Sequence, residues 1–109
     1  MDRTVVRCQD TVATIVAEKK FFPVAEAAIR EQRRILEAFI EKDPAFRTAL
    51  GPYPIPSDAP RIIRRMAEAA AKAGVGPMAA VAGAVAEAAL QEMVGAGATH
   101  ALVDNGGDI

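Results

Sequence analysis

The sequence is poor in the side chains that many enzymes use for covalent chemistry and metal binding. Its 109 residues include one cysteine (Cys8), one histidine (His100), one serine (Ser57) and no tryptophan. One cysteine excludes an internal disulfide, and a metal site with several His or Cys ligands is excluded within one chain. Ser57 precedes a predicted helix, where serine is typical of a cap, and Cys8 lies in a strand pattern, where buried thiols are common. The sequence therefore predicts no catalytic residue.

The sequence also lacks an excess of charge of either sign. The chain carries 13 basic and 14 acidic residues, for a net charge of -1, which favours neither nucleic acid nor an anionic membrane as a partner. No apolar run approaches the ~20 residues that span a bilayer, and the N-terminus lacks the apolar segment of a signal peptide. We therefore expect a cytoplasmic protein with no nucleic-acid or membrane partner.

The patterns that are present predict a single α+β domain over residues 1–109. Residues 4–17 are rich in β-branched side chains on both sides of Gln9 and Asp10, which predicts two short strands and a turn. Residues 23–42 then show helical spacing of apolar side chains, interrupted by Gln32. The charged residues of this helix, Arg33 among them, are assigned to a solvated face, with opposite-charge pairs four residues apart.

A proline-rich connector and a second helix follow. Residues 51–56 contain three prolines and predict an extended strap across the surface of one domain, although a linker between domains is the other reading. Ser57 or Asp58 is placed as the cap of a helix over residues 60–73, and Gly74 as its end.

The third predicted helix, residues 77–94, carries no charge until Glu87. An apolar helix of this kind is expected to be covered on every side. Gly83 costs roughly 1 kcal/mol in a helix interior relative to alanine, so we expect a neighbouring backbone or a ligand to lie against it. Glu87 either is partly buried with a structural partner or marks the emergence of the helix into solvent.

Two glycine-rich turns are candidates for ligand contact. Residues 74–77 precede a helix, whose free N–H groups can bind phosphate, but a plain turn between helices is the competing interpretation. Residues 99–103 predict a short strand that leads into Asn105, Gly106, Gly107 and Asp108. This segment is either a hairpin turn or a place where backbone approaches a ligand, with Asp108 as its charge.

Two runs carry a family resemblance. GVGPMAAVAGAVAE at residues 74–87 and VDNGGDI at residues 103–109 resemble an uncharacterised family of ApbE-like proteins, and the similarity covers nearly the whole chain. That family is similar, more distantly, to the ApbE flavin transferases, which bind FAD with magnesium and transfer FMN to a threonine. Gly83 and Glu87 match the glycine and the acid of the transferase helix motif, whereas Ala82 replaces its usual Lys or Glu.

The resemblance implies helices packed on a mixed or antiparallel sheet, in an apparently incomplete domain. It also implies cofactor contacts at Gly83, Asn105, Gly106, Gly107 and Asp108, with FAD or FMN and magnesium as the candidate cofactors and no transferase activity by this chain. The alternative is a non-catalytic oligomerisation module in which helix 77–94 is the interface. A homo-oligomer is expected, because a second chain or a further segment would complete the sheet and cover the helix.

Overall fold

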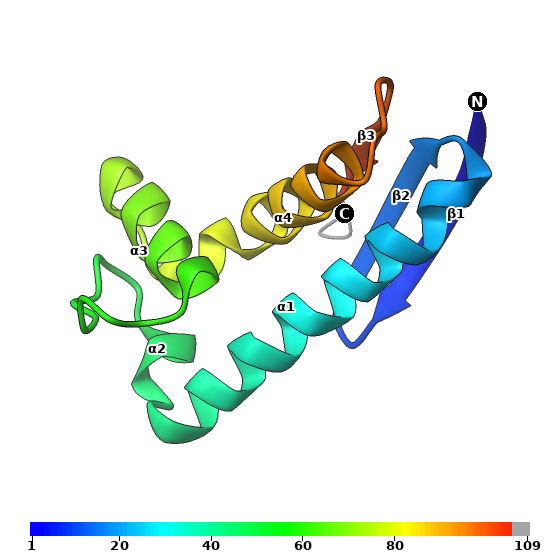
Figure 1. The fold of residues 1–109 in the computed structure, drawn as a ribbon. Coiled ribbons are helices and arrows are strands. Elements are labelled where there is room, and N and C mark those ends of the chain that lie inside the picture. Colours follow the sequence, from blue (N-terminus) through cyan, green and yellow to red (C-terminus); the bar gives the residue numbers. More distant parts are fainter. Residues whose placement is uncertain (106–109) are drawn as a thin grey trace.

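A computed structural model describes residues 1–105 and has the expected α+β architecture (Figure 1). Strands β1 (Asp2–Cys8) and β2 (Thr11–Ala17) form an antiparallel hairpin in which Cys8 pairs with Thr11. Gln9 occupies its turn with φ of 54°. Strand β3 (Leu102–Asp104) adds to the other edge of β2, also antiparallel, so the sheet order is β1-β2-β3. The two predicted strands and their turn are confirmed.

Helix α1 (Phe22–Lys42), which follows the short 3-10 helix η1 (Lys19–Phe21), packs against strands β1 and β2 and against helix α4 (Val81–Gly95), which itself contacts β3. Its buried apolar face follows the predicted spacing and consists of Ala25, Ala28, Ile29, Leu36 and Ile40. On β2, Ala13, Ile15 and Ala17 alternate toward the same core. The core is therefore assembled from one face of the sheet and the facing sides of two helices.

The assignment of Arg33 to a solvated face is wrong. Its side chain is only 3% exposed, and its Nη2 donates to Glu37 Oε2 at 2.9 Å and to Gln9 Oε1 at 3.3 Å. Glu37 in turn accepts from Arg47 at 2.8 Å. Because the β1–β2 turn supplies Gln9 and helix α2 (Ala45–Thr48) supplies Arg47, two neighbouring segments cover this side of α1. The predicted pairs of Arg33 with Glu37 and Arg30 with Glu26 are both present.

The connector runs as a strap over the core rather than as a linker between domains. Tyr53 and Ile55 pack against the core, and the Tyr53 hydroxyl donates to Asp43 Oδ1 at 2.7 Å. Helix α3 (Arg61–Ala73) buries Ile62, Ile63, Met66 and Ala70, as predicted. Neither Ser57 nor Asp58 caps it: Pro60 holds the cap position, with its carbonyl accepting from Arg64 N. Gly74, with φ of 70°, ends the helix as expected.

Helix α4 begins after the 3-10 helix η2 (Pro77–Ala80) and is not covered on every side by residues 1–105. Only Ala84, Val85, Ala89 and Met93 are buried, on the side toward the core. The rest of the helix is half-buried or exposed, because α1, α3 and β3 together reach only that side. Residues 1–105 therefore do not by themselves provide the all-round burial that the lack of charge in this helix predicted.

No single helix among residues 1–105 has the length and apolar character needed to cross a membrane. The segments Arg61–Ala73 and Pro77–Gly95 satisfy those criteria only when joined, and they are bent by 104° where they meet.

Candidate functional site

An open pocket of about 320 Å³ lies beside Gly83. Helix α3 and the segment formed by η2 and α4 line it with four alanines, the glycine and one ion pair: Arg65, Ala69, Ala79, Ala80, Gly83, Ala84 and Glu87. A Cβ added at Gly83 would meet no atom of another described segment within 4 Å. Among the described residues, no backbone packs against this glycine, so the space that it borders remains free for another molecule or another part of the protein.

Glu87 has a structural partner and also lies where the helix meets solvent, so both interpretations of its position apply in part. Its Oε1 accepts from Arg65 Nη1 at 2.9 Å, while its side chain is 56% exposed. Arg65 is less exposed, at 23%, and its Nη2 also donates to Gln91 Oε1 at 3.2 Å. The two bonds hold the guanidinium between α3 and α4, where it forms one wall of the pocket beside Gly83.

Asn105 lies close to the helix glycine. Its side-chain Nδ2 donates to the backbone oxygen of Ala82, the residue before Gly83, at 3.2 Å. The end of β3 is thereby attached to α4 at the predicted site, although the two segments are far apart in the sequence. The other predicted contacts, Gly106, Gly107 and Asp108, lie outside the described residues.

The turn at residues 74–77 is a tightly packed connection between helices. Gly76 is buried, and a Cβ added to it would lie 1.8 Å from the backbone oxygen of Ala49. Val75 N bonds back to Ala70 O at 3.1 Å, which closes the end of α3. Because the Ala49 backbone occupies the space against Gly76, the structure favours the turn interpretation over a phosphate site.

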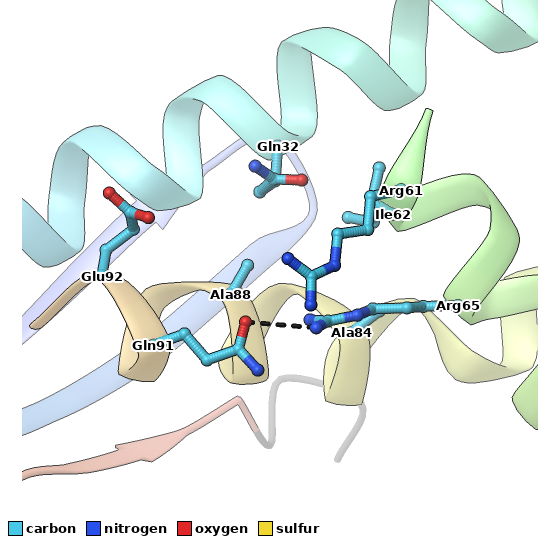
Figure 2. Close-up of a pocket in the computed structure, with 8 residues that line it drawn as sticks. All are labelled: Gln32, Arg61, Ile62, Arg65, Ala84, Ala88, Gln91 and Glu92. Carbon is cyan, nitrogen blue, oxygen red and sulfur yellow. Dashed lines mark hydrogen bonds between the residues drawn. The ribbon is translucent and has the colours of Figure 1, made fainter. Parts of the chain in front are cut away.

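A second pocket, which we call the polar pocket, was not found by the sequence analysis (Figure 2). It has a volume of about 110 Å³ and lies where α1, α3 and α4 approach one another. Its polar side chains are Gln32, Arg61, Arg65, Gln91 and Glu92. Gln32 was the one available signal, because it interrupts the apolar face of α1. Arg65 and Ala84 line both pockets, which are therefore neighbours.

Classical nucleophile and metal arrangements are not formed by the part of the chain that the structure describes. No group of three or more His, Cys, Asp and Glu side chains comes close enough there to hold a metal ion. The exposed His100 lies within hydrogen-bond distance of its neighbour Thr99, with Nδ1 and Oγ1 3.2 Å apart. Cys8 is a half-buried free thiol on β1. The described site can therefore bind and orient a ligand through backbone, arginine and amide groups.

Comparison with known proteins places this arrangement in a family. Residues 2–109 match a family model described as "AbpE bacteria". The curated relatives include proteins named UPF0280 protein from Methanocella arvoryzae, 52% identical over 101 residues, and from Methanothrix thermoacetophila, 50% identical over 111 residues. These alignments cover 93% and 100% of this chain but only 41% and 47% of the relatives.

A UPF0280 protein from Archaeoglobus fulgidus shows the same proportions, with 46% identity over 110 residues, all of this chain and 46% of the relative. The chain thus spans less than half the length of the curated relatives it matches. Since the family model covers nearly every residue, from the first strand through the Gly-Gly-Asp segment, the chain belongs to the AbpE bacteria family.

Proposed function

We propose that this chain forms part of a flavin- or nucleotide-binding site, with the ligand lying in the open pocket beside Gly83. The observation that carries the proposal is the 320 Å³ of free space against Gly83, a glycine in the first turn of α4. Small-molecule sites are concave and commonly have volumes of about 300–1,000 Å³. A flat interface helix would not need such a hollow.

The lining suits a planar ring system. The alanines and Gly83 leave the helix surface smooth, so a ring can approach close to the α4 backbone. Arg65 and Glu87 add polar groups at one side, where they can orient a ligand that has both donors and acceptors. Asn105, bonded to Ala82 O, adds an amide at the same end of α4.

The resemblance of the sequence to the ApbE flavin transferases supports FAD or FMN as the ligand. Gly83 and Glu87 occupy the positions of the transferase helix motif, and the Gly-Gly-Asp turn follows. Ala82 in place of Lys or Glu favours binding without transfer. Magnesium is less well supported: residues 1–105 bring together no carboxylate cluster, and Asp108 would be its first ligand.

Fluorescence titration of FAD and FMN with the 109-residue chain, with and without Mg²⁺, tests the proposal. Gly83→Leu should abolish flavin binding, because Gly83 lines the pocket and a leucine side chain there would take up space that the ligand needs. Gly95→Leu is the matched control: it lies in the same helix, also has open space around it, and does not line the pocket. The control should bind as the unmodified chain does.

The alternative is an oligomerisation module that uses residues 77–94 as its interface. Val94 on α4 and Leu102 on β3 are both 57% exposed, so these two apolar side chains would be available to such an interface. Native mass spectrometry of the same proteins, with and without flavin, distinguishes ligand binding from oligomerisation. A dimer that takes up no flavin, and that Gly83→Leu dissociates, would replace the flavin proposal with the interface.

A further inference from the structure

The polar pocket carries a charge pattern that the flavin proposal does not use. Five of its side chains are polar, and they come from three different helices (Figure 2). Arg65 is already neutralised by Glu87 and held by Gln91. Neither Arg61 nor Glu92 makes an ion pair or a side-chain hydrogen bond with any residue in the 1–105 range. One unpaired positive group and one unpaired negative group therefore remain.

These two groups face the pocket from different sides. Arg61 extends into it from the first turn of α3, and Glu92 stands at the other end of the pocket, on α4 (Figure 2). A pure anion would gain from Arg61 but would be repelled by Glu92, and a pure cation would meet the reverse. A small molecule that carries one charge of each sign satisfies both ends.

The neutral side chains fit the same ligand. Gln32 projects from α1 toward the pocket, within a helix face that is otherwise apolar, and its amide has no side-chain bond to any of the described residues. Gln amides supply both donors and an acceptor. Ile62, Ala84 and Ala88 form the apolar part of the lining, against which a short carbon chain can pack.

We propose that the polar pocket binds a small α-amino acid or a closely similar zwitterion. The carboxylate would lie on the Arg61 guanidinium, where bidentate charge-assisted hydrogen bonds are available. The ammonium group would lie near Glu92, and Gln32 would bond to either end. The volume of about 110 Å³ restricts the side chain to a short one. This inference does not depend on flavin binding in the neighbouring pocket.

The test is an NMR titration of the ¹⁵N-labelled 109-residue chain with glycine, L-alanine, L-serine and L-aspartate. Propionate and ethylamine serve as matched probes, since each is L-alanine without one of its charged groups, and inorganic phosphate represents a pure anion. At least one amino acid should shift the amides of the residues around Arg61 and Gln91. Propionate, ethylamine and phosphate should each bind at least tenfold more weakly.

Two variants locate the site. Arg61→Gln and Glu92→Gln should each weaken amino-acid binding at least tenfold, while their dispersed spectra show that they fold. Arg3→Gln on β1 and Glu68→Gln on α3 change the same charges at exposed positions outside the pocket and should leave binding unchanged.

Three results would overturn the proposal. The first is that none of the four amino acids shifts any amide at tens of millimolar. The second is that propionate or phosphate binds as tightly as the amino acid, in which case the pocket is an anion site. The third is binding that both Arg61→Gln and Glu92→Gln leave intact. Loss of flavin binding in Gly83→Leu has no bearing on any of these outcomes, because Gly83 does not line the polar pocket.

Discussion

Gly76 and Gly83 lie seven residues apart but have opposite surroundings: one is tightly packed and the other borders open space. Gly76 lies in what we call the joint, the buried contact formed by Phe46, Ala49, Tyr53, Gly76 and Pro77. There the Ala49 backbone leaves no room for a side chain. Seven residues later, Gly83 lies on the open face of α4, where no atom of another segment within residues 1–105 comes within 4 Å of the position of a Cβ. One glycine is required by the packing, and the other is not.

The joint and the open face also differ in what surrounds them. Phe46 is fully buried and meets Phe39 and Tyr53 edge to face, with ring centroids 5.1 and 5.9 Å away. The open face has only alanines and the Arg65–Glu87 pair. A glycine that the fold does not need, and that costs helix stability, is best understood as serving a contact outside residues 1–105. The following predictions test this contrast.

The largest effect is expected for Gly76→Ala. Its Cβ would overlap a backbone oxygen at 1.8 Å, so the strap or η2 must move. We expect a loss of about 3 kcal/mol in the free energy of unfolding, the upper part of the usual range for overpacking. Urea denaturation measures it. Gly51→Ala is the control, because no atom lies within 4 Å of its added Cβ, and a loss below about 1 kcal/mol for Gly76→Ala would contradict a tight joint.

Gly83→Ala should have a smaller effect of the opposite sign. The added methyl group meets nothing in the described residues and removes the helix penalty of glycine, so the chain should gain about 0.5–1 kcal/mol. The same denaturation experiment on the 109-residue chain detects it. If Gly83→Ala instead destabilises the chain, part of the protein already fills the open face, and the two glycines have the same role.

The smallest effect concerns the pH dependence of the joint. The hydrogen bond from Tyr53 to Asp43, together with some burial, holds the pKa of Tyr53 above its ordinary value. The protonated phenol is the form that donates this bond. Its contribution to stability is therefore complete below the unfolded pKa of about 10 and is lost as the pH rises through the higher folded pKa.

Comparison with Tyr53→Phe measures this contribution. The difference in urea midpoint between the two proteins should be constant from pH 7 to about 10 and should shrink above it. Tyr53 is the only tyrosine, so no other phenol titrates in this window. A difference that persists unchanged to pH 11 would show that the bond to Asp43 does not stabilise the joint.

Local signals in the sequence predicted the elements well. The β-branched runs, the helical spacing after Pro23 and the glycine after Ala73 identify the hairpin, α1 and the end of α3, because each depends on neighbouring residues only. Where the structure departs from the sequence predictions, the cause is contact between distant parts of the chain. Arg33 is buried by the distant Gln9 and the α2 segment, and α4 is exposed where no segment of residues 1–105 reaches it. Both outcomes depend on tertiary contacts that no local pattern encodes.

The candidate site likewise contains residues that local motifs identified and a pocket that only the tertiary structure reveals. Gly83 and Asn105 were identified by their motifs, and the structure brings them to one end of α4. Gly106, Gly107 and Asp108 stay predictions. The polar pocket could not be foreseen, because Gln32, Arg61 and Glu92 come from three helices whose approach is decided by the core. The only sequence signal for this pocket was Gln32, a polar residue on the otherwise apolar face of α1.

The order of strands in the sheet has a consequence for how the site is assembled. Strand β2 is joined to its partner β1 by a two-residue turn, whereas all the helices in the described residues lie between β2 and its other partner, β3. Closing so long a loop carries a greater entropy cost than closing a hairpin, and such non-local pairings slow folding. Asn105 reaches α4 by way of this last pairing. The proposed binding surface at Gly83 is therefore completed only when the first and last strands of the described chain share a sheet.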